Sequence, residues 1–122
     1  NLFRHQPGAF AGDARALELA RACRHKGLDQ ELGWEERVFL YLPFEHSEAW
    51  EDQELSLECF GALSRQVPPE HSSLFAGYLD YAHRHAEIIR RWGRYPHRNQ
   101  ALGRASSPEE QQFLKQPGSS FW

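Results

Sequence analysis

Residues 70–92 read EHSSLFAGYLDYAHRHAEIIRRW, and this stretch decides the fold class. Its apolar residues recur every three or four positions, which is the spacing of one face of an α-helix. The spacing predicts a helix over 70–92 whose middle carries His85. The predicted buried seam consists of Leu74, Tyr78, Tyr81, His85, Ile88 and Trp92, flanked by Phe75, Leu79, Ala82, Ala86 and Ile89.

Helical spacing continues on both sides of this segment. It predicts further helices over 13–26, 34–41, 47–66 and 108–115. Pro43 is expected to end the second of these, and Ser47 to cap the third. Ser107 opens a Ser-Pro-Glu-Glu run, which is the pattern of a capping box. No stretch alternates as a strand does, so the sequence predicts a single all-α domain over 1–122, with helix pairs able to stack as a solenoid.

Composition excludes two broad classes of function. The chain has 14 Lys and Arg against 17 Asp and Glu, a net charge of −3, so it lacks the basic excess that nucleic-acid binding needs. Its mean hydropathy is −0.72, and no apolar run approaches the roughly 18 residues that cross a bilayer, so no membrane span is expected. Cys23 and Cys59 lie in apolar helical patterns, which indicates buried thiols in a reducing, cytoplasmic compartment.

Polar residues gather in three places where helix packing does not require them: 45–53, His85 and 94–104. If the helix face carrying Glu48 and Asp52 meets His85, an imidazole and two carboxylates share one partly desolvated region. Such a group suits either proton transfer or metal binding. The economical metal set is His46, Glu48, His85 and His97, although its spacing matches no known metal motif.

The arginines of the 94–104 segment have two interpretations. Arg94, Arg98 and Arg104 can hold a phosphate or carboxylate ligand, because a guanidinium binds such anions through two parallel hydrogen bonds. Alternatively, they pair within the protein with Glu45, Glu48 and Asp52. The internal network is favoured because a buried carboxylate without a partner is costly.

These motifs resemble a known family. The chain reads YLPFEHSE at 41–48, Asp52-Gln53, GRYPHRN at 93–99 and LGR at 102–104. This pattern is similar to the bacterial domain of unknown function 924, which usually has Phe in place of Tyr95 and of Trp92. The resemblance implies an α-α superhelix like that of tetratricopeptide repeats, and no established reaction. The motif residues that match are Glu45, His46, Ser47, Glu48, Gln53, His85, Arg94, Pro96, His97, Arg98, Asn99, Gly103 and Arg104.

The resemblance also bears on the front of the chain. The family is longer there, and Asn1-Leu2-Phe3-Arg4 is similar to the end of its leading segment. We therefore expect exposed apolar surface that either this leading segment or a second copy of the chain covers.

Three hypotheses about function follow. In the first, the protein is a binding module for an anionic small molecule or peptide. Its ligand-binding residues are then Glu45, His46, Gln53, Arg94, Arg98, Asn99 and Arg104. In the second, it is an acid/base or metal-assisted hydrolytic enzyme in which Glu48 works with His85 or His97. In the third, the polar residues form a purely structural clasp. The sequence assigns no cofactor to any of them.

Overall fold

The computed structural model describes residues 13–117 and 119, and all the regular structure in this part of the chain is helical. The all-α prediction is therefore confirmed. The α-helices are α1 (Asp13–His25), α2 (Trp34–His46), α3 (Trp50–Gln66), α4 (Ser72–Trp92), α5 (Asn99–Leu102) and α6 (Pro108–Leu114). Three short 3-10 helices join them: η2 (Leu28–Glu31), η3 (Pro69–His71) and η4 (Pro96–Arg98).

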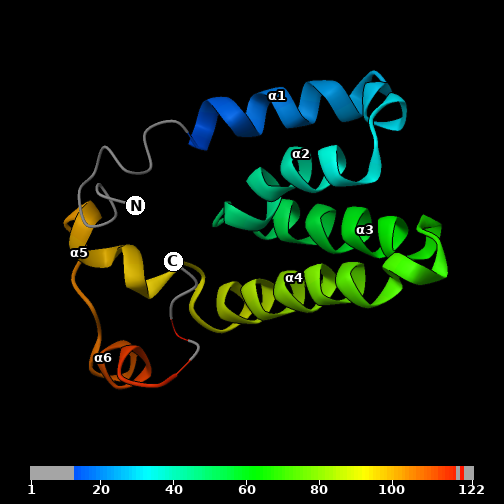
Figure 1. Ribbon diagram of the computed structural model, residues 1–122. Helices are drawn as coiled ribbons and strands as arrows, with labels where there is room; N and C mark the ends of the chain where they lie inside the picture. The colour runs from blue at the N-terminus through cyan, green and yellow to red at the C-terminus, as the bar shows by residue number, and fades with distance from the viewer. Residues whose placement is uncertain (1–12, 118, 120–122) are drawn as a thin grey trace.

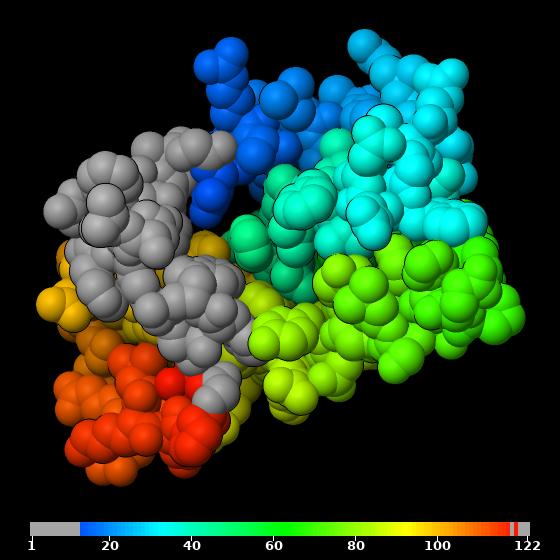
Figure 2. Space-filling model, in the orientation of Figure 1, coloured from blue at the N-terminus to red at the C-terminus, as the bar shows by residue number. Residues whose placement is uncertain are grey.

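Helices α1 to α4 form an antiparallel stack in chain order (Figure 1). Helices α5 and α6 lie beyond the end of this stack at which α4 finishes. In the space-filling view, the red C-terminal helix lies well away from the blue and cyan helices (Figure 2). A tetratricopeptide-like superhelix remains a prediction. None of the described helices combines the length and the apolar character needed to cross a bilayer.

Aromatic and aliphatic side chains hold the stack together. Phe44, Phe60, Leu63 and Phe75 are almost fully buried in one cluster shared by α2, α3 and α4. Each fully buried side chain of this size contributes about 1.5–3 kcal/mol by leaving water. A second, smaller cluster of Ile88, Ile89 and Tyr95 joins the end of α4 to the following loop, with Trp92 and Phe113 packed against it.

The prediction that Pro43 ends a helix over 34–41 is wrong. Helix α2 continues through Pro43 to His46. Proline removes one backbone hydrogen bond, here to the carbonyl of Phe39, whose side chain is exposed on the solvent side of the helix. The last turn is retained because it buries the Phe44 side chain.

The start of the third predicted helix also differs. Helix α3 begins at Trp50, and Ser47 lies in the preceding loop. Its hydroxyl accepts a hydrogen bond from the Ala49 N–H at 3.1 Å and donates one to Asp52 Oδ2 at 2.7 Å. Glu48 is therefore a loop residue and does not extend the apolar face of α3 as predicted.

The buried face of α4 is rotated from the predicted one. Leu74 and Tyr81, which were expected in the seam, are about half exposed, whereas the flank residues Phe75, Ala82 and Ala86 are buried. The predicted seam and its flank are both apolar, so helical periodicity alone cannot decide which of them is buried. His85 is buried as predicted.

Three other expectations can be placed. Cys23 and Cys59 are both free thiols; Cys59 is buried as predicted, whereas Cys23 is only partly buried. Ser107 forms the predicted capping box with Glu110 at the start of α6. The family-like segment Asn1–Arg4 lies outside the described residues.

Candidate functional site

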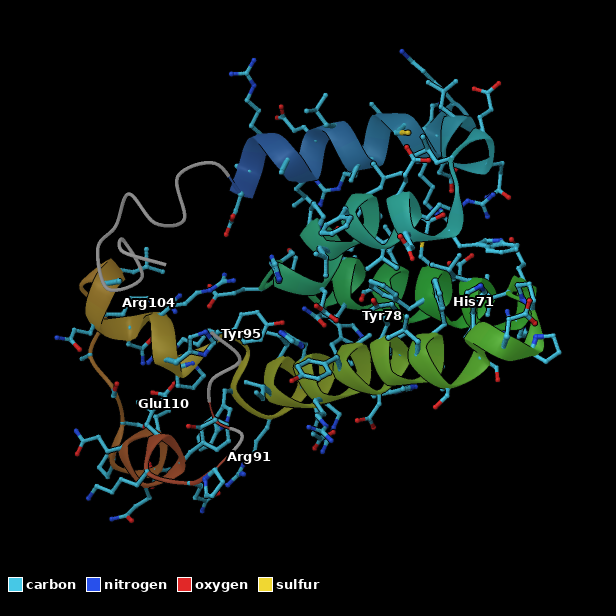
Figure 3. All side chains as sticks on the ribbon, viewed as in Figure 1. His71, Tyr78, Arg91, Tyr95, Arg104 and Glu110 are labelled. Carbon is cyan, nitrogen blue, oxygen red and sulfur yellow. The ribbon has the colours of Figure 1, made fainter. Side chains whose placement is uncertain are left out.

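The motif segments meet at one end of the helical stack. Residues 45–53 come from the end of α2 and the start of α3, and the 94–104 segment folds back onto them. Figure 3 shows Tyr95, Arg104 and Glu110 at this end, away from Tyr78 on α4 and His71 in η3. The structure therefore brings the 45–53 and 94–104 segments together at this end.

Glu48, in the loop between α2 and α3, binds the 94–104 segment. It accepts a hydrogen bond from the Tyr95 N–H at 2.6 Å and two from the Arg104 guanidinium at 2.8 and 3.0 Å. Arg104 also donates to Asn99 Oδ1 at 3.0 Å and to the Tyr95 carbonyl at 3.1 Å. Burial raises the pKa of Glu48, but the hydrogen bonds from Arg104 and Tyr95 outweigh it, so its pKa is lowered overall. This carboxylate is fixed in its ionised form, which suits a structural clasp better than proton transfer.

A second ion pair, between Arg94 and Glu110, holds helix α6 in place. Arg94 donates to both carboxylate oxygens of Glu110 at 2.9 and 2.7 Å and to the Ala105 carbonyl at 2.8 Å. The hydrogen bonds from Arg94 lower the pKa of Glu110 to about 2. Arg104 and Glu48 thus form part of the predicted internal network. Arg94 instead pairs with Glu110, a residue that was expected only in the capping box of the last helix.

Asp52 has a partner that the sequence analysis did not consider. Arg21 on α1 donates to both Asp52 oxygens at 2.7 Å. The three arginines of the loop are therefore not the partners of Asp52. No sequence signal connects positions 21 and 52, because their contact depends on how the fold places α1 relative to the start of α3.

Gln53 and Tyr95 hold the last turn of α2. The Gln53 amide donates to the carbonyls of Glu45 and Ser47, both at 2.7 Å, and to the Tyr95 hydroxyl at 2.8 Å. The Tyr95 hydroxyl in turn donates to the Glu45 carbonyl. Burial raises the pKa of Tyr95, so the phenol remains protonated as this donor. These bonds fix the backbone on which the Glu45 side chain stands.

The Glu45 carboxyl is the unusual group of the site. It is only 4% exposed, and burial raises its pKa to about 7. Its Oε1 lies 3.8 Å from His85 Nδ1, and its Oε2 lies 3.9 Å from His46 Nε2. Both distances are beyond hydrogen-bond distance. Glu45, rather than the predicted Glu48, is therefore the carboxyl beside His85 that can gain and lose a proton near neutral pH.

His85 is a neutral imidazole. Its Nδ1 lies 2.8 Å from the Tyr81 carbonyl oxygen, and since a carbonyl only accepts, Nδ1 carries the hydrogen. Burial lowers the pKa of His85 to about 4, although the bond to Tyr81 opposes this. Burial likewise lowers the pKa of His46, with a further contribution from Arg98. Both rings are therefore uncharged at neutral pH.

The remaining predicted residues surround the Tyr95 ring. His85 meets it edge-on with ring centroids 5.7 Å apart, His97 lies 5.5 Å away, and the Arg98 guanidinium carbon lies 4.7 Å from the ring centroid. Burial lowers the pKa of Arg98. Asn99 donates to the Ser106 hydroxyl at 3.0 Å. All of the predicted site residues except Arg94 thus lie in or directly against one polar cluster around Glu45, Glu48 and Tyr95.

A metal centre is not formed by the described residues. No group of three or more His, Cys, Asp or Glu side chains in this part of the chain is arranged to hold a metal ion. The metal alternative that combined His46, Glu48, His85 and His97 therefore receives no support, because Glu48 is turned to Arg104.

A groove between α2 and α4 leads to Glu45. Its volume is about 480 Å³, and its lining is predominantly apolar. Sequence reasoning missed it because Tyr78 and Tyr81 were expected in the buried seam of the 70–92 helix, whereas Tyr81 is half exposed, and Phe39 on α2 is 74% exposed. The residues that line it are Glu35, Val38, Phe39, Leu42, Glu45, Phe60, Tyr78 and Tyr81. We call it the α2–α4 groove.

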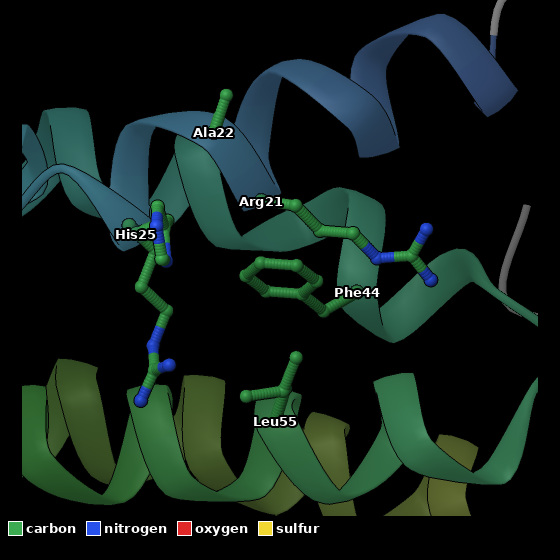
Figure 4. A pocket seen from close by; sticks show the side chains of 6 residues that line it. Arg21, Ala22, His25, Phe44 and Leu55 are labelled. Carbon is green, nitrogen blue, oxygen red and sulfur yellow. The ribbon is translucent and has the colours of Figure 1, made fainter.

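A second hollow, of about 460 Å³, lies between α1 and α3 above Phe44 and Leu55 (Figure 4). Its arginines are engaged at its sides: Arg21 with Asp52, and Arg24 with Glu58 at 3.0 Å. None of the predicted site residues lines it. Of the motif residues, Glu45 lines the α2–α4 groove.

Comparison with known proteins gives the following matches. The family described as "Bacterial protein of unknown function (DUF924)" matches residues 1–118. The solved structure of a protein of unknown function from Agrobacterium tumefaciens is similar, with 34% sequence identity and a TM-score of 0.76. The match covers 93% of this chain and 58% of the Agrobacterium chain, so this chain spans less than two thirds of that relative. No curated protein matches the chain significantly.

Proposed function

The chain belongs to the DUF924 family of bacterial proteins of unknown function, and we propose that it is a binding module whose ligand, a small molecule or a peptide segment, occupies the α2–α4 groove. One observation carries the proposal: the groove is apolar along its walls and has a buried carboxyl, Glu45, as its innermost polar group. An apolar hollow of this size with one perturbed titratable group is the usual form of a small-molecule site.

The motif residues support this function indirectly. Gln53 and Tyr95 hold the backbone carbonyl of Glu45, and Glu48 with Arg104 holds the Tyr95 loop in place. A site whose key group is fixed by surrounding hydrogen bonds loses less entropy on binding. The hydrogen bonds of the structural clasp therefore hold the binding site in position.

Binding is favoured over hydrolysis by the residues of the groove. None of the described side chains that line it is Ser, Thr, Cys or His, so the groove offers neither a hydroxyl or thiol nucleophile of the Ser, Thr or Cys type nor an imidazole to activate one. The anion-binding version of the hypothesis is also weakened. Arg94 and Arg104 are engaged by Glu110 and Glu48, and the charged side chains of the groove are acidic.

The experiment uses the neutral fluorophore N-phenyl-1-naphthylamine, whose emission rises in apolar sites. We expect saturable binding to the unmodified protein and its loss in Phe39→Asp, which places a charge on the groove wall at a highly exposed position. Leu19→Asp is the matched control, because Leu19 is 65% exposed on α1 and outside the groove. Absence of saturable binding, or equal binding by both variants, would contradict the proposal.

A further inference from the structure

Resting on the proposed function, we infer that the ligand is an apolar amine: a cationic ammonium group that meets Glu45, attached to an aromatic or aliphatic body that lies along the α2–α4 groove. This inference names the chemical class of the ligand. Three features of the groove carry it: the sign of its charges, its aromatic rings and the position of its carboxyl.

The charge of the groove has one sign. Its charged lining residues are Glu35 at the rim and Glu45 inside, and no described Lys or Arg side chain lines it. An anionic ligand would have to give up its hydration next to these carboxyls without gaining a cation in the groove. A cation would gain a desolvated partner instead, and partners of opposite charge are attracted far more strongly when water is excluded.

The walls of the groove are rich in aromatic rings. Phe39 comes from α2, Phe60 from α3, and Tyr78 and Tyr81 from α4. The face of an aromatic ring carries partial negative charge and attracts an ammonium group within about 6 Å. Aromatic rings together with a carboxylate are the combination that proteins use to hold organic ammonium ions.

The groups that face Glu45 do not oppose a cation. His46 on α2 and His85 on α4 are the nearest, at 3.9 and 3.8 Å, and both imidazoles are uncharged at neutral pH. Arg98 lies over the Tyr95 ring and is not part of the groove lining. Glu45 therefore meets a ligand as an acid whose charge a bound ammonium group can neutralise.

The experiment compares three probes of one shape by calorimetry on the full chain: 4-phenylbutylamine, 4-phenylbutanol and 4-phenylbutyrate, which are cationic, neutral and anionic near pH 8. We expect the amine to bind about tenfold more tightly than the alcohol, which corresponds to one charge-assisted contact. The butyrate is expected to bind least. In Glu45→Gln the preference of amine over alcohol should fall to about one, with the affinity for the alcohol retained.

Glu51→Gln is the matched control, because Glu51 is an exposed carboxylate on α3 outside the groove. It should keep the preference for the amine. A preference that survives in Glu45→Gln, or tighter binding of the butyrate, would overturn the inference while leaving the groove as a binding site. If none of the probes bound while N-phenyl-1-naphthylamine did, the inference would also be overturned. Failure of every probe would contradict the proposed function itself.

A second measurement uses the unmodified protein and does not depend on the folding of a variant. An ammonium ion prefers ionised Glu45, so the affinity for 4-phenylbutylamine should rise about tenfold between pH 6 and pH 8, as this carboxyl loses its proton. The affinity for 4-phenylbutanol should not follow the same curve. An amine affinity that stays constant over this range would overturn the role of Glu45.

Discussion

The helical stack and the loop end of the molecule are stabilised by different means. In the stack, Phe44, Phe60, Leu63 and Phe75 pack without polar partners, so any side chains of the right size and spacing would serve. At the loop end, Glu48, Tyr95 and Arg104 are buried or half-buried polar groups that depend on particular donors and acceptors. Apolar packing is enough to form the fold, whereas the polar end adds precise geometry at a cost in desolvation.

This difference indicates where function resides. A protein that needed only a stable helical stack would gain nothing by burying Glu45 without a cation in hydrogen-bond distance among the described residues. The loop end instead fixes that carboxyl at the groove. The predictions below test whether the two regions can be disturbed separately.

The largest effect is expected in the stack. Leu63→Ala removes a side chain that is 2% exposed in the main core cluster, and we expect a loss of about 2–5 kcal/mol in the free energy of unfolding. Leu63 does not line the α2–α4 groove, so probe binding by the folded variant should be unchanged. Urea denaturation and fluorophore binding at low temperature measure the two quantities. Loss of binding in a folded variant would mean that the regions are coupled.

The next prediction concerns Glu45 and His85, whose titrations change the stability of the fold in opposite directions. Glu45 has a pKa of about 7 in the folded protein against 4.5 for the free group, so the folded state holds a proton that the unfolded chain has lost. Its contribution to stability therefore falls as pH rises through that window. His85 has a pKa of about 4 against 6.5, so its contribution rises with pH between these values. Between about pH 4.5 and 6.5 the two slopes cancel in the unmodified protein.

Single variants should reveal each slope. In Glu45→Gln the free energy of unfolding should increase as pH rises from 4.5 to 6.5, and in His85→Gln it should decrease, each by an amount on the order of 2–3 kcal/mol relative to the unmodified protein. Burial also lowers the pKa of His46, which adds in the direction of His85. Urea denaturation across this range is the measurement. Variants whose slopes match that of the unmodified protein would show that neither group is perturbed.

A smaller effect is expected from breaking the clasp that Glu48 forms with Tyr95 and Arg104. Glu48→Ala leaves the Tyr95 N–H and the Arg104 guanidinium without their acceptor, and we expect a loss of about 1.5–3 kcal/mol. Glu51→Ala, at an exposed carboxylate on the neighbouring turn, should cost under about 0.5 kcal/mol. Because Glu48 positions the loop that holds Glu45, Glu48→Ala should also weaken the preference for the amine probe. Equal effects of the two substitutions on stability would contradict the clasp.

The smallest effect is expected from one hydroxyl. Tyr95→Phe removes the group that bonds the Glu45 carbonyl and accepts from Gln53, but Gln53 continues to donate to the same carbonyl. We expect a loss of no more than about 1 kcal/mol. Thermal denaturation of the variant checks this, and a much larger loss would show that the hydroxyl holds the loop by itself.

Much of the helical architecture could be predicted from the sequence, because helix periodicity is a local property. The spacing of residues 70–92 predicts α4, and the Ser107 capping box predicts the start of α6. The start of α2 at Trp34 was predicted, but its C-terminal end and the buried face of α4 could not be. Packing of Phe44 overrides Pro43, and Leu74 and Tyr81 are as apolar as the residues that are buried.

The site could be predicted as a set of residues but not as an arrangement. Glu48 and Arg104 are 56 positions apart, and Gln53 and Tyr95 are 42 apart, so no local pattern pairs them. The motif includes Glu45 and His85, which the structure places next to each other. Helical spacing offered Glu48 as the proton-transfer group instead, because the burial of each carboxyl is a property of the fold. The α2–α4 groove gave no sequence signal, because exposed and buried aromatic residues look alike in a sequence.

Chemical-shift mapping of the full chain by NMR during titration with 4-phenylbutylamine tests most directly whether the α2–α4 groove is the binding site. We expect the largest shifts on Phe39, Leu42 and Glu45 of α2 and on Tyr78 of α4, with little change at Ala22 and Leu55 in the second hollow. Shifts centred on Ala22 and Leu55, or no saturable shifts at all, would contradict it.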